Sequence, residues 1–569
     1  MQLTPQQLET VFVKSGLLSE ADFETAKKHS ADKKTPLQNI LVEENFISDE
    51  HLGELLADYF SWKFINLRKQ EIVRDILKII PEAVARKQSI VCFKRDLVGL
   101  HAAMADPENV EIVSFLEKKT GLPVTAYYAT ERDIENTLSK YKAEVKEDFQ
   151  TILQANIESL AGMSPEQVER QGKDLPVIRM MDALLDYAYD SRASDIHIEP
   201  QSGRTIVRFR IDGILHDIID FPVSIHDLLI TRLKILSRLR TDEHRAPQDG
   251  KLQKQIGKEK LDVRVSIVPV TEGEKVVMRL LSERSREYSL EDLGITDQDL
   301  ALVKASIKRP FGMTIVCGPT GSGKTTSLYA MIKIINTREV NISTVEDPVE
   351  YHLAGINQIQ VNPKVGLTFA AGLRSLLRQD PNVVLVGEIR DAETAKIAIN
   401  AAMTGQLVLT TLHTTNAAMA LPRLLDMEVE PFLVSSTIHL VMAQRLVRKI
   451  HPGCIASYSV TPEEVANIKE QLGEEHAKAV GLDRVGLRLY RGAGCKVCKN
   501  TGYEGRLGIF EILEMKENIR KAIMKHATAD ELEQIAIKEN GMRTMLEDGI
   551  AKALNGLTTI EEVLRVRGE

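Results

Sequence analysis

The segment from residue 318 to residue 325, which reads GPTGSGKT, constrains this chain more than any other part of its sequence. It fits the pattern G-x-x-x-x-G-K-[ST] in full, and a chance glycine turn is the alternative. We expect an apolar strand just before it, at 313–317, and a helix just after it, at 326–335. In that context the glycine-rich turn and the helix N-terminus present backbone N–H groups to phosphates. The sequence therefore predicts a nucleotide phosphate site on an α/β sheet.

The polar side chains of this segment have expected roles. Lys324 reaches the β- and γ-phosphates, and the hydroxyl of Thr325 ligates Mg²⁺. We therefore expect a nucleoside triphosphate with Mg²⁺ as the bound species. The candidate phosphate-binding residues are Gly318, Pro319, Thr320, Gly321, Ser322, Gly323, Lys324, Thr325 and Thr326.

Two acidic clusters follow apolar strands and can complete such a site. Glu346 and Glu350 lie in NISTVEDPVEY, and Glu388 and Asp391 lie in NVVLVGEIRD. Continuous apolar runs such as VVLV are typical of parallel strands that are buried on both faces. Ligands of such sheets bind at the carboxyl ends of the strands, so both clusters point at the phosphates. We expect functional roles for Glu346 and Glu388, and helix-capping roles for Glu350 and Asp391.

Composition limits the class of protein. The chain has 569 residues, of which 43% are hydrophobic and 27% charged, with a net charge of −8. We expect a folded protein of roughly three to four domains. The acidic balance and the 5% aromatic content give no support to a nucleic-acid partner. No apolar stretch approaches the ~20 residues of a membrane-spanning helix, and the start of the chain lacks the pattern of a secretory signal.

The sequence texture changes along the chain and divides it into five expected parts. Residues 8–19 and 37–48 repeat one apolar pattern, which predicts two similar helical hairpins. Short alternating segments then indicate α/β structure, and a polar stretch indicates a linker. The expected parts are a helical repeat module at 1–75, a small α/β domain at 76–141, a linker at 142–173, a smaller α/β domain at 174–286, and the phosphate-binding domain at 287–569.

A histidine and three cysteines form the pattern H-x₂-C…C-x₂-C: His451, Cys454, Cys495 and Cys498. Two such knuckles supply the four N/S ligands of a closed, structural zinc site. A three-cysteine site completed by some other residue is the alternative. We predict Zn²⁺ here, where it would hold an insertion at 449–506. The other cysteines, expected to pack in apolar strands, are Cys92 and Cys317.

Several longer segments resemble one known family. GPTGSGKTT, VEDPVEY and VGEIRDAETAKIAINAAMTGQLVLTTLHTTNA are similar, in this order, to the Walker A, Asp-box, Walker B and His-box motifs of the secretion and pilus ATPase superfamily. The resemblance extends upstream through SDIHIEP, VRFRIDG, APQDGK and LDVRVSIVPVTEGEKVVMRLL, and downstream to GYEGRLGIFEIL. It covers about residues 174–569. Residues 1–141 are more loosely similar to the amino-terminal domain of the assembly and secretion branches.

This resemblance implies a fold class and an assembly. The expected fold is α/β, with a carboxy-terminal RecA-like P-loop ATPase domain that follows a smaller, PAS-like α/β domain. An amino-terminal helical plus α/β regulatory region precedes both. The family forms ring hexamers, so we expect a homohexamer in which hydrolysis closes and opens the cleft between the two domains in turn around the ring.

The resemblance also implies roles for individual residues. Glu346 resembles the Asp-box acid thought to polarise the attacking water, and Glu388 resembles the Walker B acid that acts through Mg²⁺ or water. Which of the two is the base stays open. His413 resembles the His-box residue that senses the γ-phosphate, whereas Gln406 stands where many relatives have histidine.

Three arginines complete the set that the resemblance implies. Arg264 and Arg279 match arginines that the smaller domain of the family offers to the γ-phosphate, and Arg210 is a further candidate. An arginine fork neutralises the charge that spreads over the phosphoryl oxygens during transfer. Surface ion pairing is the alternative role for arginines on strands. Fingers that act in trans would imply a ring.

The function implied by the resemblance is mechanical. ATP hydrolysis would move a platform protein of the bacterial inner membrane that assembles pilin-like subunits, with a cytoplasmic accessory protein as a second partner. We expect a cytoplasmic chain, peripherally associated with that membrane. The length and the two-part amino-terminal region favour the type IV pilus assembly (extension) branch. The alternative is the type II secretion branch, which drives pseudopilus assembly and protein export. The retraction branch is excluded because it lacks the long amino-terminal region and the zinc knuckle.

The helical repeat resembles modules that bind cyclic di-GMP in some relatives. Those modules start with Arg-Leu-Gly and carry a glycine before the apolar pair. The first copy here starts at Gln7 and keeps Gly16, whereas the second starts at Thr35-Pro36 and has Asn45 in place of glycine. The missing arginine and the missing glycine disfavour binding of this second messenger. A regulatory amino-terminal module that responds to cyclic di-GMP stays an additional alternative.

Overall fold

A computed structural model describes this chain. The described residues are 9, 11–13, 18–33, 37–43, 46–70, 72–77, 79–80, 82–96, 98–135, 137–138, 176–256, 259–281, 288–473, 477, 480–482, 487–495, 498 and 500–567. The linker expected at 142–173 lies outside them, as do Gln7, Gly16, Thr35, Pro36 and Asn45. Within the described residues no helix has both the length and the apolar character that crossing a membrane requires.

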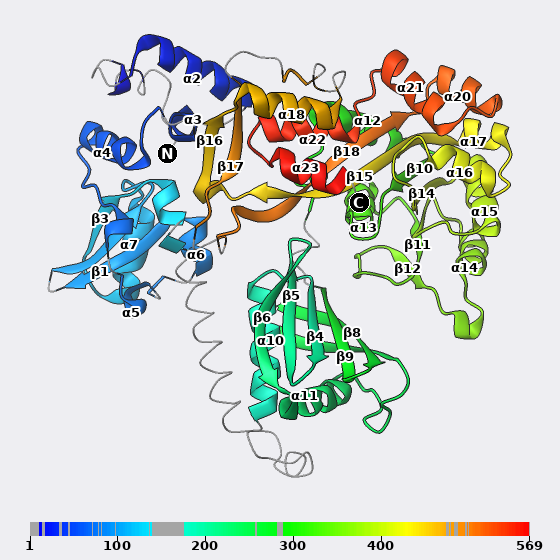
Figure 1. The fold of residues 1–569 in the computed structure, drawn as a ribbon, viewed down its shortest axis with the longest axis horizontal. Coiled ribbons are helices and arrows are strands. Elements are labelled where there is room, and N and C mark those ends of the chain that lie inside the picture. The colour runs from blue at the N-terminus through cyan, green and yellow to red at the C-terminus, as the bar shows by residue number, and fades with distance from the viewer. Residues whose placement is uncertain are drawn as a thin grey trace.

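The amino-terminal part combines a helical module with a small sheet (Figure 1). The helices are α2 (Glu20–Lys33), α3 (Leu37–Glu43) and α4 (Asp49–Phe60), and they pack around an apolar core. The strands are β1 (Ile90–Asp96), β2 (Gly99–Met104) and β3 (Val124–Tyr128), with α7 (Val110–Thr120) between the last two. Strand β2 pairs antiparallel with β1 and parallel with β3. The backbone of Lys63 and Ile65 bonds Tyr128, which joins the module to the sheet.

The smaller α/β domain is a six-stranded sheet with two helices. Its helices are α10 (Pro176–Asp190) and α11 (Val223–Leu236). Its strands are β4 (Asp195–Gln201), β5 (Arg204–Ile211), β6 (Ile214–Pro222), β7 (Gln248–Ile256), β8 (Glu259–Val270) and β9 (Gly273–Leu281). The strand order is β6-β5-β4-β9-β8-β7, and every neighbouring pair is antiparallel. One face packs on both helices and forms the core, which leaves the other face for polar side chains.

The largest domain holds a seven-stranded sheet in the order β12-β11-β13-β14-β10-β15-β18. The strands are β10 (Gly312–Cys317), β11 (Ile342–Glu346), β12 (Asn357–Gln360), β13 (Val383–Val386), β14 (Leu407–Leu412), β15 (Ile438–Ile450) and β18 (Tyr503–Glu514). All pairs are parallel except β15 with β18. Separate apolar cores cover its two faces, and the expected α/β class is confirmed.

Helices flank this sheet on both sides. They are α12 (Asp297–Ile307), α13 (Lys324–Ile335), α14 (Phe369–Leu376), α15 (Ala392–Met403), α16 (Ala420–Asp426), α17 (Pro431–Thr437), α20 (Glu517–Met524), α21 (Ala529–Asn540), α22 (Met545–Leu554) and α23 (Ile560–Arg567). The strand and the helix expected around the phosphate segment are confirmed as β10 and α13.

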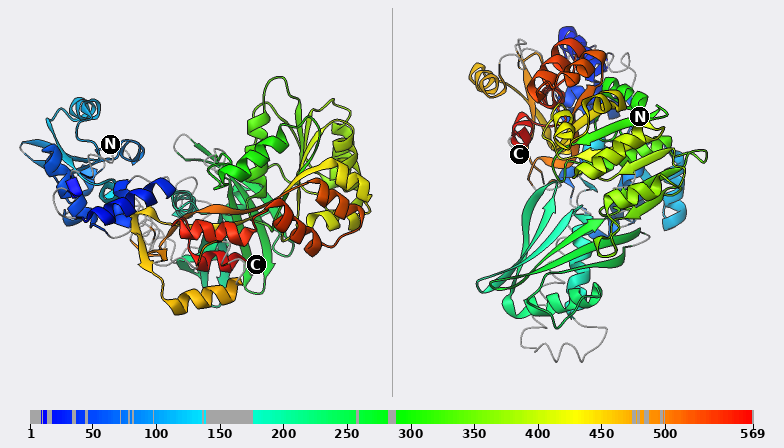
Figure 2. Two further views of the ribbon diagram at one scale, coloured as in Figure 1. Left: turned by 90° about the horizontal axis from the view of Figure 1, so that it is seen from above. Right: turned by 90° about the vertical axis from the view of Figure 1, so that its right-hand side faces the viewer.

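An insertion between β15 and β18 reaches toward the amino-terminal part. It contains η4 (Pro452–Cys454), β16 (Ile455–Ser459), α18 (Pro462–Leu472) and β17 (Arg488–Gly492). Strands β16 and β17 form a separate antiparallel pair. Figure 2 shows the molecule as elongated, with the amino-terminal part at one end and the large sheet at the other. The insertion lies between them.

Candidate nucleotide site and metal centre

Four neighbouring strands of the large sheet bring the predicted site residues to one edge. Strand β10 leads into Gly318, and β11 ends at Glu346. Glu388 follows β13, and His413 follows β14 directly. Because these strands are parallel and adjacent, their carboxyl ends lie side by side. The fold therefore gathers the phosphate segment, both acids and the histidine, as the sequence predicts.

The phosphate segment makes a tight turn that depends on glycine. Gly318 has a φ of +148°, and a Cβ placed there would lie 2.5 Å from the hydroxyl oxygen of Ser322. The same Cβ would lie 2.7 Å from the carbonyl oxygen of Gln444. Gly323 has a φ of 90° and is the N-cap of α13. The turn thus needs glycine at both positions, and it ends in the helix N-terminus that attracts phosphates.

Gln444 of β15 clamps this turn from beneath. Its side-chain amide donates to the carbonyl oxygen of Ser322 at 2.6 Å, and it accepts from the hydroxyl of Ser327 at 2.7 Å. Both bonds are buried, so they fix the turn against the first turns of α13. Sequence reasoning missed Gln444, although a lone amide within the apolar run HLVMAQRLV is a usable signal.

Lys324 lies against its own loop. Its ammonium group donates to the carbonyl oxygens of Gly318 at 2.8 Å and Pro319 at 2.9 Å. Burial lowers the pKa of this ammonium, and the negative charge of Glu388 acts in the opposite direction. A phosphate group would offer Lys324 stronger, charged acceptors than two carbonyls. Thr325 and Thr326 lie in the same first turn of α13, and Thr320 and Gly321 are exposed at the tip of the loop.

Glu346 is buried in a network of neutral donors. Its carboxylate accepts from the hydroxyls of Tyr329 and Thr344, and from the amide of Gln358 at 3.3 Å. Burial raises the pKa of Glu346, whereas these hydrogen bonds lower it. A carboxylate with a raised pKa suits proton abstraction near neutral pH. Sequence reasoning missed Tyr329, because a tyrosine in an apolar helix gives no signal of its own.

Glu388 forms a different pair of contacts. One of its oxygens lies 3.0 Å from Nε2 of His413, and the other forms an ion pair with Arg390. Glu388 is 9% exposed, and the His413 side chain is 47% exposed. The histidine predicted to sense phosphate is therefore held by the acid predicted to act through Mg²⁺.

Two further acids have structural partners. Asp391 caps α15 as predicted, because its side chain accepts from the backbone N–H of Thr394 at 2.7 Å. The expectation that Glu350 caps a helix is wrong, because no helix lies between β11 and β12. Instead Glu350 forms an ion pair with Arg264 of the smaller domain at 3.2 Å.

The three candidate arginines occupy one row across the sheet of the smaller domain. Asp195 on β4 lies directly opposite Arg210 on β5 and Arg279 on β9. Arg279 in turn lies directly opposite Arg264 on β8. Arg279 Nε donates to Asp195 at 2.9 Å, and Arg210 Nε lies 3.6 Å from the same carboxylate. Direct cross-strand partners point to one face, so the row presents three cations beside one anion.

Arg264 is the member of this row that reaches the large domain. Its Nη2 donates to the carbonyl oxygen of Val349 at 2.8 Å, in addition to the Glu350 pair. Both partners lie in the segment that follows Glu346. The Arg264 end of the row therefore lies against the segment that follows Glu346.

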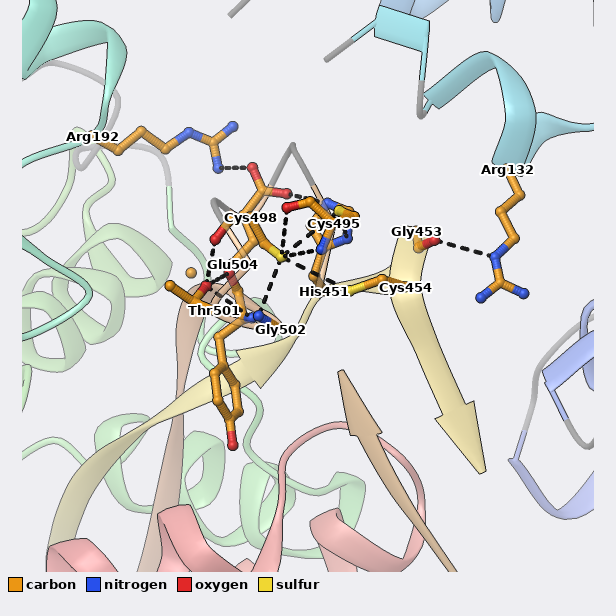
Figure 3. Close-up of polar contacts among 12 residues, drawn as sticks. Arg132, Arg192, His451, Gly453, Cys454, Cys495, Cys498, Thr501, Gly502 and Glu504 are labelled. Carbon is orange, nitrogen blue, oxygen red and sulfur yellow. Dashed lines mark hydrogen bonds and ion pairs between the residues drawn. The ribbon is translucent and has the colours of Figure 1, made fainter. Parts of the chain in front are cut away.

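The predicted metal ligands come together in the insertion (Figure 3). Cys498 Sγ lies 3.9 Å from Cys454 Sγ and 3.7 Å from Cys495 Sγ, and Cys495 Sγ lies 3.8 Å from His451 Nδ1. A tetrahedron with Zn–S bonds of 2.3 Å places its sulfur atoms ~3.8 Å apart. The spacing of the sulfur atoms therefore fits thiolates on one zinc ion, and the ligand atoms of His451, Cys454 and Cys495 all lie within 4.8 Å of one another.

Surrounding groups orient these ligands. The backbone N–H groups of Cys495 and Gly502 both donate to Cys498 Sγ at 3.2 Å, which stabilises its thiolate. These bonds lower the pKa of Cys498 against the effect of burial. His451 is fully buried, and its Nε2 lies 3.3 Å from a carboxylate oxygen of Glu504. A carboxylate behind the second ring nitrogen is typical of metal-bound histidine.

One buried acid near the site was missed. Glu511 on β18 is 2% exposed and accepts from the backbone N–H groups of Ala417 at 2.8 Å and Met545 at 3.4 Å. Burial raises its pKa to about 7. Its two hydrogen bonds connect the loop after His413 to the start of α22. A single acid in the apolar run GIFEIL is a signal that sequence reasoning could have used.

Known proteins resemble this chain over most of its length. Residues 170–565 match the family described as Type II/IV secretion system protein, and residues 60–148 match the MshEN domain. A type IV pilus assembly ATPase PilB from Myxococcus xanthus is 38% identical over 566 residues, or 98% of each chain. A type II secretion system protein E from Xanthomonas campestris is 38% identical over 554 residues, or 96% of each chain.

A solved structure shares the fold. The ATPase DotB of Yersinia pseudotuberculosis superposes with a TM-score of 0.50 at 19% identity, covering 69% of this chain and 93% of the other. At this level of identity the likeness concerns the fold alone.

Proposed function

Because this chain belongs to the family of type II/IV secretion system proteins, which are ATPases, we propose that it couples ATP hydrolysis to the assembly of a type IV pilus. The observation that carries the proposal is that relatives named pilus assembly ATPase match almost the whole chain. One is 38% identical and another, from Pseudomonas aeruginosa, 36% identical, each over 98% of both chains. The match therefore includes the amino-terminal part as well as the ATPase domain.

The second candidate function is that of the type II secretion ATPase. A protein E of that system is 38% identical over 96% of both chains, so overall similarity separates the two candidates poorly. The two candidate functions would use the same ATPase domain. The difference lies in the filament that is assembled, a pilus or a pseudopilus.

In the proposed chemistry, the turn from Gly318 to Thr325 would hold the phosphates of ATP, and the Thr325 hydroxyl would hold the Mg²⁺ that offsets their charge. Lys324 exchanges its two carbonyl acceptors for β- and γ-phosphate oxygens. Glu388 would act through the bound Mg²⁺ or through water, and His413, whose Nε2 lies 3.0 Å from Glu388, would contact the γ-phosphate. The charge of Glu388 raises the pKa of Lys324, which supports a position of Glu388 near the phosphates that Lys324 would bind.

We assign the role of general base to Glu346. Its burial raises its pKa toward the working range of a base, whereas Glu388 forms an ion pair with Arg390 and lies 3.0 Å from His413. Water that enters beside the γ-phosphate would have to displace one of the present donors of Glu346, which are Tyr329, Thr344 and Gln358.

The arginine row supplies positive charge from the smaller domain. Arg264 already lies against the segment after Glu346, and Arg279 and Arg210 are held by Asp195. We propose that closure of the two domains brings Arg279 from Asp195 to the γ-phosphate. The released arginine would stabilise the charge of the transition state.

Structural zinc and a ring assembly complete the proposal. Zn²⁺ bound by His451, Cys454, Cys495 and Cys498 would fold the insertion. The chain would act as a homohexamer at the bacterial inner membrane, against a platform protein and a cytoplasmic accessory protein. Metal analysis that returns well under one zinc per folded chain would reject the zinc assignment.

The test of the pilus proposal is made in the native host. The chromosomal gene is replaced by a Lys324→Ala version, with Lys333→Ala on the exposed side of α13 as a matched control. Sheared surface pilin and secreted enzymes are assayed in parallel. Lost pili with normal secretion supports pilus assembly. Lost secretion with intact pili assigns the protein to type II secretion, and loss of neither rejects both.

A further inference from the structure

Arg132 joins the amino-terminal part to the metal-site insertion by hydrogen bonds (Figure 3), and helix α3 also lies close to strand β16 of that insertion. Arg132 donates from Nη2 to the carbonyl oxygen of Ile455 at 2.8 Å, and from Nε to that of Gly453 at 3.3 Å. The two acceptors flank Cys454, a predicted metal ligand. A guanidinium that bridges two carbonyls recognises a specific backbone shape, because its donors have a fixed geometry.

That backbone shape belongs to the metal knuckle. The backbone N–H of Cys454 donates to the carbonyl of His451 at 3.1 Å, and the carbonyl of Cys454 accepts from Ala493 at 2.8 Å. The turn thus carries two ligand side chains within four residues. Small knuckles of this kind owe their fold to the metal that they bind. The positions of the two carbonyls that bind Arg132 therefore depend on the same residues that would bind the zinc.

The opposite side of the knuckle contacts the smaller domain. Glu504, whose Oε2 lies 3.3 Å from His451, places its Oε1 3.5 Å from Nη1 of Arg192. The next residue, Gly505, donates its backbone N–H to the carboxylate of Asp212 at 2.9 Å. Arg192 lies in the turn before β4 and Asp212 in the turn after β5, so both turns lie at the same end of the antiparallel β4–β5 pair.

These two turns border the arginine row. Arg192 lies shortly before Asp195, and Asp212 lies shortly after Arg210. The knuckle is consequently bonded on one side to the amino-terminal part and on the other to the strands that carry Asp195 and Arg210. The knuckle thus connects the amino-terminal part to the smaller α/β domain through these polar contacts.

The junction with the amino-terminal part is incompletely packed. A cavity of about 140 Å³ lies there, lined by residues of α4, of the segment around Arg132 and of the knuckle. Its apolar lining residues include Leu52, Leu56, Pro452 and Ile455. Arg132 and its acceptor Ile455 both line this cavity, so one of the hydrogen bonds that join the two parts lies at its edge.

From these contacts we propose that the metal-folded knuckle is the docking surface of the amino-terminal domain, which Arg132 holds to it. Through Glu504 the knuckle joins that domain to the arginine-bearing domain. The proposal rests on the zinc assignment made above. When the metal is removed, the carbonyls of Gly453 and Ile455 lose their spacing and the amino-terminal domain separates.

Hydrogen exchange on the full-length chain tests this proposal. Four samples are compared: untreated protein, protein stripped of metal by a chelator, Arg132→Ala, and Arg95→Ala. Arg95 is an exposed arginine on β1 of the same amino-terminal part and serves as the matched control. The readouts are exchange in residues 131–135 and 453–459, together with zinc content.

The proposal predicts that Arg132→Ala keeps its zinc, whereas both segments exchange about tenfold faster than in Arg95→Ala. Metal stripping should speed exchange in 131–135 as much as Arg132→Ala does. Unchanged exchange in 131–135 after zinc removal would overturn the metal dependence. Equal exchange in Arg132→Ala and Arg95→Ala would overturn the docking contact. Protein isolated without any zinc would refute the zinc assignment itself, and the two arginine variants would still decide whether Arg132 holds the domain.

Discussion

Removal of the hydroxyl group of Tyr329 should change the pH dependence of ATP hydrolysis. This hydroxyl donates to the buried carboxylate of Glu346 and lowers the pKa of that group. A hydrogen bond to a charged group contributes about 1.5–3 kcal/mol. Because one pKa unit corresponds to ~1.4 kcal/mol, Tyr329→Phe should raise the pKa of Glu346 by about 1–2 units. The base is inactive when protonated, so the acidic limb of the kcat profile should move to higher pH by that amount.

The assay is kcat for ATP hydrolysis, measured across the pH range in which the protein stays folded. Tyr288→Phe, at a tyrosine that is 48% exposed, makes the same chemical change away from the site. It should leave the profile where it is. A folded Tyr329→Phe protein with the acidic limb of the unsubstituted chain would refute Glu346 as the base and favour Glu388.

Arg279→Ala should lower ATP turnover by about 10³-fold with little change in nucleotide affinity; equal losses in both would remove its role on the γ-phosphate. Glu511 has a pKa raised from 4.5 to about 7, so it stabilises the fold below its unfolded-state pKa and this contribution is lost as pH rises through 7. Glu511→Gln should therefore abolish about 3 kcal/mol of pH-dependent stability, which thermal unfolding at pH 5 and pH 8 would detect; an unchanged difference would contradict this. Cys454→Ser should reduce zinc from about one per chain to near zero and lower the unfolding temperature while ATP binding persists; retained zinc would favour another ligand set.

Much of the candidate site follows from contiguous motifs. The turn at 318–325 defines its own geometry, and apolar runs identify the buried strands that precede Glu346 and Glu388. Parallel pairing then brings their carboxyl ends to one edge without further information. The histidine and cysteine pairs are equally local, because each pair is three residues apart in the sequence.

The contacts that sequence reasoning missed join distant residues. Gln444 clamps a turn that precedes it by more than a hundred residues, and Glu511 holds the loop after His413 from another strand. Such pairs depend on which strands become neighbours, and spacing does not reveal this. The arginine row likewise requires the register of β4 against β5 and β9. Glu350 resembled a helix cap in sequence, but the chain after it stays irregular and the acid pairs with Arg264 across domains.

The most direct test of the central claim is a structure of this protein with Mg²⁺ and a non-hydrolysable ATP analogue. In that structure the ammonium group of Lys324 should leave the carbonyls of Gly318 and Pro319 for the β- and γ-phosphates. An arginine of the row, Arg279 foremost, should lie within hydrogen-bond distance of the γ-phosphate. A bound nucleotide with Lys324 still on those carbonyls, or with Arg210, Arg264 and Arg279 all out of reach, would contradict the account.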